Sequence, residues 1–344
     1  MNLNDLFKIA SQSKASDLHL IVGKPPILRI DGELRAIPNT EVLSKANAEK
    51  MIFSIITEKQ RDQFIAEREL DISYEITGYS RYRVNLHWEK DNVGMVARVI
   101  SQIIPSMEDL GLPPIVHRLI EREQGLILIT GPTGCGKSTT LAAMIEKINN
   151  IRFANIITLE DPIEYIFKPD KSIIKQRQLG TDMLTFGNAL KHVLRQDPNV
   201  IMVGEMRDLE TIAATITLAE TGHLVLATLH THNAAQTIDR IIDVFPPHQQ
   251  AQVRLQLSMS LSGVISQKLL PKIGGGRVAA REILINTPAV ANIVRENKVP
   301  QIKTVIQTSA DVGMFSMDQN IRELLENKLI DEPTAMAHTT TSQK

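Results

Sequence analysis

The sequence predicts an α/β protein in which a small mixed α+β domain precedes a larger domain with a mostly parallel sheet. The chain has 344 residues, enough for two domains of roughly 150 residues each. From Val116 onward, short apolar runs alternate with segments whose apolar residues have helical spacing, as in parallel sheets covered by helices on both faces. A glycine-rich loop lies between the first of these apolar runs and the helical segment that follows it.

The composition excludes several classes of protein. A hydrophobic share of 43% and a charged share of 22% are those of an ordinary folded protein, so a wholly disordered chain is excluded. The 38 basic and 39 acidic residues nearly cancel, which argues against a sequence-independent grip on nucleic acid or anionic lipid. The single cysteine, Cys135, can form neither an internal disulfide nor a cysteine-based structural zinc site.

The sequence shows no sign of membrane insertion or export. No apolar run reaches the ~18 residues of a membrane span, and the N-terminus lacks a basic start followed by an apolar core. We therefore expect a cytoplasmic protein.

Residues 1–103 are expected to form the small domain, and residues 104–114, rich in proline and glycine, a linker. The predicted elements of the small domain are a strand at 18–22, a strand at 27–30 followed by a turn at Asp31 and Gly32, a helical stretch at 44–65, and an alternating, sheet-like stretch at 79–99.

The larger domain is expected to consist of an α/β core at 115–270, a helical region at 271–333 and a flexible tail at 334–344. Its predicted strands are 126–130, 156–159, 200–203 and 224–228, and its predicted helices are 138–149, 186–194 and 209–220. After Pro247 the chain is expected to be mostly helical, with an interruption at three successive glycines, 274–276.

A phosphate-binding motif follows the first strand of the larger domain. It fits the pattern G-x-x-x-x-G-K-[ST] and reads Gly131-Pro132-Thr133-Gly134-Cys135-Gly136-Lys137-Ser138-Thr139. Its glycines allow backbone N–H groups to turn toward phosphates, and the following helix presents its positive end to the anion. Lys137 would reach the β- and γ-phosphates, and the Ser138 hydroxyl would bind Mg²⁺. The sequence therefore predicts a site for ATP with Mg²⁺.

Two strands of this domain end in acidic residues. Glu205 follows the strand at 200–203, and an acid there would orient or deprotonate the water that attacks the nucleotide. Gly204 occupies the usual position of an aspartate that supports the metal, so metal support is expected from the acidic run at 159–164. Glu164 is the candidate in that run for catalysis and, directly or through water, for Mg²⁺; an acidic turn that is only solvated is the alternative.

Histidines lie at both ends of the predicted strand at 224–228. His230 follows the carboxyl end, where ligands bind in parallel sheets, and is placed to sense the γ-phosphate. His223, at the other end, would brace the strand or touch a neighbouring subunit; a strand capped by hydrogen-bonded histidines is the alternative. His232 is interpreted as a loop residue, and no spacing indicates a histidine metal site.

Three arginines of the small domain are candidates for nucleotide contact. Arg81 and Arg83 share one face of a strand because side chains alternate with a period of two, and Arg98 lies in the same sheet-like stretch. These residues are either solvated strand residues or a guanidinium face that a ring-forming ATPase directs at nucleotide, where arginine stabilises the charge of the transition state.

Taken together, these motifs resemble the secretion ATPases of the type II/type IV pilus superfamily. Besides the phosphate loop, the resemblance is carried by Glu160-Asp161-Pro162-Ile163-Glu164, Gly204-Glu205-Met206-Arg207-Asp208 and Thr221–His230. The segments that resemble the pilus retraction branch are Ser16-Asp17-Leu18-His19, Arg29-Ile30-Asp31-Gly32 and Gly274–Glu282. The match spans about residues 3–331. The short start and the single cysteine fit this branch, because extension and type II secretion members typically carry a longer N-terminal region and a four-cysteine zinc motif.

The resemblance implies a PAS-like α+β N-terminal domain followed by a RecA-like P-loop ATPase domain with a helical C-terminal region. It implies catalytic roles for Glu205, Glu164, His230 and His223, and nucleotide contacts across subunits for Arg81, Arg83 and Arg98. The implied function is a hexameric motor that hydrolyses ATP to retract type IV pili. Its implied partners are an inner-membrane platform protein, which would recruit it to the cytoplasmic face of that membrane, and a second retraction ATPase.

Three alternatives to this function remain open at the level of the sequence. The family's helix Ala-Ile-Arg-Asn-Leu-Ile-Arg-Glu corresponds here to residues 289–296, and one arginine is replaced by Ala291, so an accessory retraction ATPase is the alternative within the family. Outside it, the alternatives are a RecA-like nucleic-acid translocase and a scaffold that binds ATP without hydrolysis. Balanced charge argues against the first and the presence of Glu205 against the second.

Cys135 stands inside the phosphate loop, where the family more often has serine. A thiol near a helix N-terminus can have a lowered pKa. We therefore expect a reactive Cys135 whose alkylation blocks ATP binding.

Overall fold

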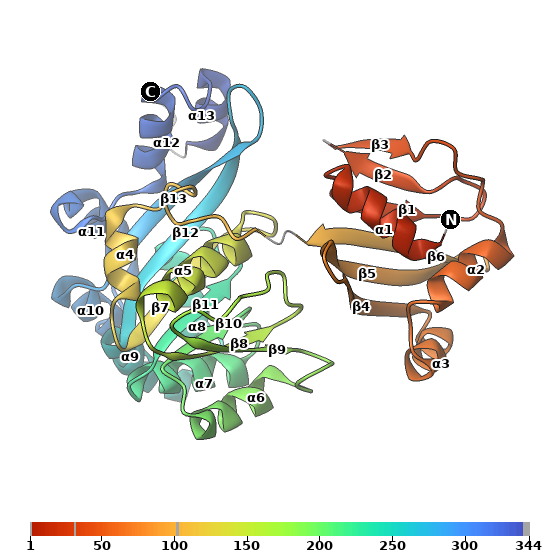
Figure 1. Cartoon of the computed structure of the whole chain (residues 1–344). Helices are drawn as coiled ribbons and strands as arrows, with labels where there is room; N and C mark the ends of the chain where they lie inside the picture. The colour runs from red at the N-terminus through yellow and green to blue at the C-terminus, as the bar shows by residue number, and fades with distance from the viewer. Residues whose placement is uncertain (1, 31, 101–102, 340–344) are drawn as a thin grey trace. The chain divides into compact units, whose positions relative to one another are not determined.

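The computed structural model describes residues 2–30, 32–100 and 103–339 (Figure 1). The chain divides into two compact units. The first comprises Met1–Ile103 with Glu164–Ile166, and the second Ile104–Ile163 with Phe167–Lys344. Asp31, expected in a turn, and residues 340–344 of the expected tail lie outside the described residues.

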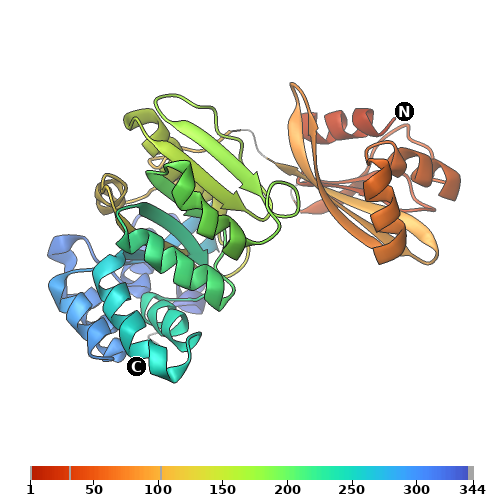
Figure 2. The same ribbon diagram turned by 90° about the horizontal axis from the view of Figure 1, so that it is seen from below.

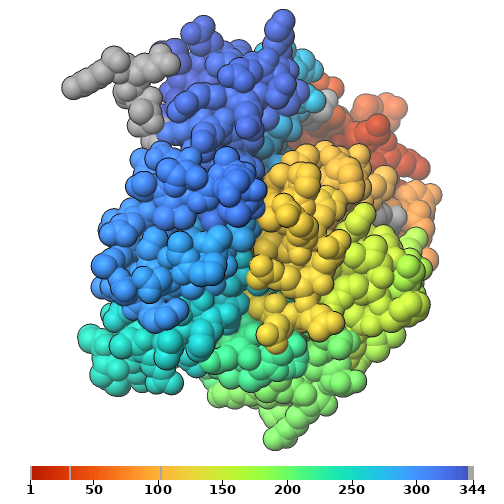
Figure 3. Space-filling model, turned by 90° about the vertical axis from the view of Figure 1, so that its left-hand side faces the viewer, coloured from red at the N-terminus to blue at the C-terminus, as the bar shows by residue number. Residues whose placement is uncertain are grey.

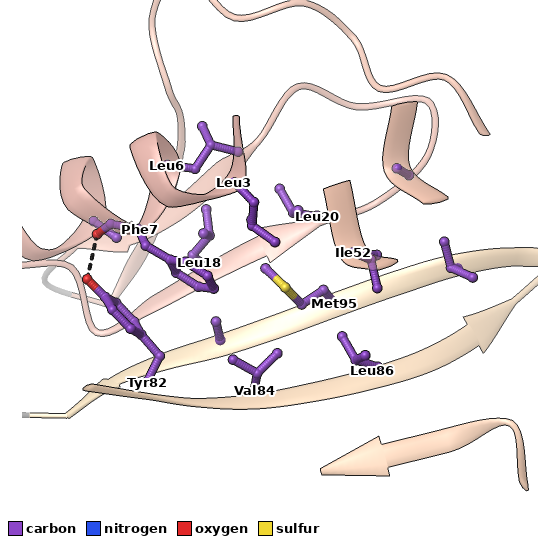
Figure 4. Close-up of a cluster of buried hydrophobic side chains, with 14 of the residues drawn as sticks. Leu3, Leu6, Phe7, Leu18, Leu20, Ile52, Tyr82, Val84, Leu86 and Met95 are labelled. Carbon is purple, nitrogen blue, oxygen red and sulfur yellow. Dashed lines mark hydrogen bonds between the residues drawn. The ribbon is translucent and has the colours of Figure 1, made fainter. Parts of the chain in front are cut away.

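The first unit is built on an antiparallel sheet whose strand order is β3-β2-β1-β6-β5-β4. The strands are β1 (Asp17–Leu20), β2 (Ile27–Ile30), β3 (Glu33–Ala36), β4 (Glu69–Ile76), β5 (Ser80–Glu89) and β6 (Asn92–Ile100). The helices are α1 (Leu3–Gln12), α2 (Lys45–Phe53) and α3 (Glu58–Glu67). Alternate residues of β5 point into the core, where the buried Tyr82 hydroxyl donates a 2.8 Å hydrogen bond to the Phe7 carbonyl (Figure 4).

The second unit contains a mostly parallel sheet whose strand order is β13-β12-β7-β11-β10-β8-β9. The strands are β7 (Gly125–Thr130), β8 (Asn155–Glu160), β9 (Ile173–Gln178), β10 (Val200–Val203), β11 (Leu224–Leu229), β12 (Leu261–Pro271) and β13 (Arg277–Ile285). Only β13 pairs antiparallel with its neighbour. The central strands β7, β8, β10 and β11 are buried along their whole length, as expected for a sheet covered on both faces.

Helices cover both faces of this sheet. The α-helices of the second unit are α4 (Pro114–Ile120), α5 (Lys137–Ile151), α6 (Phe186–Val193), α7 (Leu209–Glu220), α8 (Ala234–Asp243), α9 (Pro247–Ser260), α10 (Pro288–Arg295), α11 (Ile302–Thr308), α12 (Met317–Glu326) and α13 (Glu332–His338). The connection from β7 to β8 runs across the sheet in the opposite direction to the connection from β10 to β11. Right-handed crossovers therefore place α5 on one face and α7 on the other (Figure 2).

The structure refines three expectations for the secondary structure. The helical stretch at 44–65 is two helices, because the capping box of Thr57 and Gln60 starts a second helix. The region after Pro247 contains five α-helices, as expected, and also a long hairpin of β12 and β13 around the three glycines, which was not expected. The first residues of the expected tail belong to α13, which runs to His338 and buries Ala335.

Among the described residues, no helix combines the length and the apolar character needed to cross a membrane.

Candidate active site

The phosphate loop connects the end of β7 to α5 in a conformation that requires glycine. Gly131 has a φ of 143°, and a Cβ there would come within 2.2 Å of the Gln267 carbonyl oxygen. Gly136, with a φ of 89°, directly precedes the helix. The first turn of α5 directs its backbone N–H groups toward the loop, so the loop forms an anion site at the helix N-terminus.

Lys137 lies inside this loop and is buried. Its Nζ donates to the carbonyl oxygens of Gly131 at 2.8 Å and Pro132 at 3.1 Å. The same Nζ lies 3.4 Å from Nδ1 of His230, which also contacts the Thr133 hydroxyl at 3.4 Å. The cation is thus held by the carbonyls of the loop beside the position that phosphate would take.

His230 joins the lysine to Glu205. Because β7, β11 and β10 are adjacent and parallel, the residues that follow their carboxyl ends meet at one edge of the sheet. His230 follows β11, and its Nε2 lies 3.1 Å from Glu205 Oε1, just after β10. The other carboxylate oxygen of Glu205 accepts a 2.8 Å hydrogen bond from Arg207. A continuous chain of contacts therefore runs from Lys137 through His230 and Glu205 to Arg207.

This environment keeps Glu205 ionised. Burial raises the pKa of its carboxyl group, but the hydrogen bond from Arg207 and the charges of His230 and Arg207 outweigh burial, so the pKa lies below its ordinary value. A carboxylate held in its charged form beside a phosphate loop can orient a water molecule or accept its proton.

The acidic run after β8 divides into three environments. Glu160 is buried, and its carboxylate accepts from the Thr158 hydroxyl at 2.6 Å and from Gln176 at 3.0 Å, so it serves the fold. Asp161 lies 3.9 Å from Arg207 and extends the chain of charges that begins at Lys137. Glu164 groups with the first compact unit.

Gly204 occupies a crowded position. A Cβ there would lie 3.1 Å from the Leu159 carbonyl oxygen and 3.4 Å from the Glu160 Cα, and the glycine carbonyl accepts from the Thr228 hydroxyl. A side chain at this position would require the backbone of β8 to move by a few tenths of an ångström.

Comparisons with known proteins identify the family to which the chain belongs. A model of the family described as type II/IV secretion system protein matches residues 2–309. The chain belongs to this family. The resemblance seen in the sequence motifs is thereby confirmed.

The family members most relevant to function are pilus ATPases. The chain is 47% identical over 335 residues, 97% of each chain, to the type IV pilus retractation ATPase PilT of Pseudomonas aeruginosa. It is 38% identical over 339 residues, 98% of this chain and 88% of the relative, to the type IV pilus ATPase PilU of the same organism. A crystal structure of the pilus retraction motor PilT with bound ADP superimposes with a TM-score of 0.94, at 44% identity over 99% of this chain and 98% of that one. The predicted α/β architecture is therefore that of a known secretion ATPase.

His223 lies away from the cluster formed by Lys137, His230 and Glu205. It precedes β11, at the end of the strand opposite His230, where its Nδ1 lies 3.0 Å from the Leu218 carbonyl and 3.3 Å from the Thr221 hydroxyl. Six residues of extended chain separate the two histidines, about 20 Å. In this chain His223 braces the turn between α7 and β11.

The three arginines lie on one face of the antiparallel sheet of the first unit. Arg83 pairs with Arg98 across β5 and β6, and Arg81 is two residues before Arg83 on the same strand. Arg98 donates to Asp17 at 3.1 Å. The shared face inferred from the period of two is therefore present.

Gln267 is a site residue that the sequence did not reveal. Its buried side-chain amide donates to the Cys135 carbonyl at 2.9 Å and accepts from the Thr140 hydroxyl at 2.9 Å. It lies on β12, in a segment expected to be helical, and no motif marks it.

Cys135 is not the reactive thiol expected from the sequence. Its side chain is buried at 3% exposure against Gly131, and burial raises the thiol pKa despite the nearby Lys137. We predict that iodoacetamide modifies the native protein at pH 7 at least about tenfold more slowly than the urea-unfolded chain, as measured by mass spectrometry. Equal rates would show that the loop opens readily and would contradict this correction.

Proposed function

We propose that the chain is a motor ATPase that powers type IV pilus retraction. The observation that carries this proposal is the contact chain Lys137–His230–Glu205 at the phosphate loop. It places a phosphate-binding cation and an ionised carboxylate on the two sides of one histidine. The similarity to PilT over nearly the full chain supports retraction as the work that hydrolysis drives.

In the proposed mechanism, the backbone N–H groups of residues 134–139 and the Lys137 ammonium hold the phosphates. Glu205 positions a water molecule and accepts its proton. His230, in contact with both Lys137 and Glu205, reports the presence of the γ-phosphate to the carboxylate.

The residues present fit a magnesium ion bound mainly by the nucleotide. Among the described residues, no three His, Cys, Asp or Glu side chains form a group that could hold a metal, and Mg²⁺ commonly relies on substrate phosphates, water and one or two protein ligands. We assign the Ser138 hydroxyl as the protein ligand and Glu164 as a carboxylate acting through water. The ion would neutralise phosphate charge during transfer.

The assembly we propose is a hexamer in which the arginine face of one subunit, Arg81, Arg83 and Arg98, reaches nucleotide held by its neighbour. His223 then acts at the subunit boundary instead of at the phosphate loop. The ring would work at the cytoplasmic face of the inner membrane on a platform protein, with a second retraction ATPase as a partner and without nucleic acid or membrane insertion. Because Ala291 replaces an arginine of the family's helix, an accessory retraction ATPase is the second candidate function.

Deletion of the gene in its own bacterium, followed by complementation, tests this function. We expect surface pili to accumulate and twitching to stop, with both restored by the wild-type chain but not by Glu205→Gln. Loss of all pili would instead indicate an extension motor. Normal twitching in the deletion strain would reject the main retraction role.

A further inference from the structure

The hairpin of β12 and β13 places two buried polar side chains opposite one another. Gln267 on β12 pairs directly with Arg281 on β13, and the two are 2% and 5% exposed. Directly paired residues of an antiparallel ladder project their side chains to the same face. This directly paired couple, which we call the Gln267–Arg281 rung, thus places an amide and a guanidinium on the same face of the hairpin.

At one end of this rung, the Gln267 side chain is hydrogen-bonded both to the phosphate loop and to α5. Its amide nitrogen donates to the carbonyl of Cys135, inside the loop, and its amide oxygen accepts from Thr140, in the first turn of α5. The Gln267 backbone also touches the loop, since its carbonyl oxygen faces Gly131. A shift of the loop on nucleotide binding must therefore move Gln267 or break these hydrogen bonds.

At the other end of the rung, the Arg281 guanidinium is hydrogen-bonded to the first residues of the second unit, which we call the lead-in segment (residues 104–112). Its Nη2 donates to the Leu110 carbonyl at 2.7 Å and its Nη1 to the Gly111 carbonyl at 3.1 Å. Met107 and Leu112 of the same segment are buried, so the guanidinium fixes a turn between two apolar anchors. In Figure 3 the yellow surface that includes this part of the chain lies against the blue C-terminal part.

Burying the Arg281 guanidinium to hold a turn costs free energy. The ion pairs of the described residues include no carboxylate partner for Arg281, and its Nε has no hydrogen-bond partner. Burial lowers its pKa to about 10. Desolvating a cation costs several kcal/mol when no anion compensates, and an apolar side chain would fill the space without this cost. We therefore attribute the arginine at this position to its hydrogen bonds with two carbonyl groups.

We propose that the Gln267–Arg281 rung couples the phosphate loop to the lead-in segment, so that nucleotide binding changes how firmly the segment that follows the first unit is held. Gln267 is a positioning residue of the loop, and Arg281 passes its displacement to the turn at residues 107–111. Coupling of this kind is reciprocal, so the state of the lead-in segment also changes nucleotide affinity. The inference rests on nucleotide binding at the loop and not on pilus retraction.

Hydrogen exchange of the full-length protein tests the coupling. The amides of Leu110, Gly111 and Leu112 donate turn hydrogen bonds within the lead-in segment, and their exchange is compared without nucleotide, with MgADP and with a non-hydrolysable MgATP analogue. In the wild type we expect the rates to differ about fivefold or more between nucleotide states. In Gln267→Leu and Arg281→Met we expect less than about a twofold difference.

Two features of the experiment make it decisive. Arg281→Met is expected to keep binding nucleotide, with any change in Kd limited to the coupling factor, because the Arg281 guanidinium donates to the lead-in segment and its backbone N–H donates to Asn320. Arg277→Met, an exposed arginine of the same hairpin, is the matched control and should keep the full nucleotide response. If Arg281→Met does not fold, Arg281→Lys, which keeps the cation but not the two-carbonyl grip, replaces it in the same comparison.

The outcomes separate this proposal from the proposed function. A wild-type chain that binds nucleotide but shows no response in the lead-in segment, or an Arg281 variant that keeps the full response, overturns the coupling alone. A wild-type chain that binds no nucleotide overturns the ATPase assignment as well.

Discussion

Replacement of Glu205 by glutamine is expected to lower kcat for ATP hydrolysis by a factor of about 10²–10⁴, while the Kd for ATP stays within about threefold of wild type. Glutamine keeps the size of the side chain and can still accept from Arg207, but its amide cannot take a proton from water at neutral pH. Phosphate release and equilibrium nucleotide binding measured on the same preparation check both halves of the expectation.

The matched control for this variant is Glu210→Gln. Glu210 lies in the first turn of α7, is exposed and pairs with Lys191, so the same chemical change is made away from the phosphate loop and should leave kcat unchanged. Undiminished turnover in Glu205→Gln would remove Glu205 as the base and would leave Asp161 as the next carboxylate in the contact chain.

Replacement of Lys137 by methionine is expected to abolish tight nucleotide binding. Methionine fills a similar volume but leaves the phosphates without a cation inside a buried loop. Removing one partner of a buried, hydrogen-bonded charge pair costs about 2–5 kcal/mol, so the Kd for ATP should rise by roughly 30-fold to several thousand-fold. Titration with a fluorescent ATP analogue measures this directly.

Lys191→Met controls for the loss of a lysine as such, because Lys191 is the exposed partner of Glu210. The melting temperature of Lys137→Met, measured without nucleotide, checks that the variant is folded when its nucleotide binding is measured. Binding within a factor of about three of wild type would show that the phosphates do not approach Lys137, contrary to the assignment of the loop.

The core of the second unit and the central cluster of its site could be predicted from sequence because they depend on local patterns. Short apolar runs indicated β7, β8, β10 and β11, and parallel strands bring the residues after their carboxyl ends to a common edge. Each of the three central site residues follows such a strand or its loop: Lys137, Glu205 and His230. To predict that they lie close together, only the order of the strands in the sheet was needed in addition.

The features that escaped prediction depend on contacts distant in sequence. β12 and β13 have apolar and small residues that fit either a helix or a buried strand, and only pairing with β7 settles the choice. Gln267 lies 132 residues from the carbonyl that it binds, so no spacing could identify it. Cys135 illustrates the same limit, because its position at a helix N-terminus favoured a reactive thiol while its burial, set by the packed loop, has the opposite effect.

The charges around the phosphate loop alternate in sign: Lys137, Glu205, Arg207 and Asp161 form a row of two cations and two anions. Arg207 lies beside both carboxylates of this row, 2.8 Å from Glu205 and 3.9 Å from Asp161. These two acids therefore have a protein cation as counterion whether or not nucleotide is bound. Release of the nucleotide and its metal ion would not leave either carboxylate without a neighbouring positive charge.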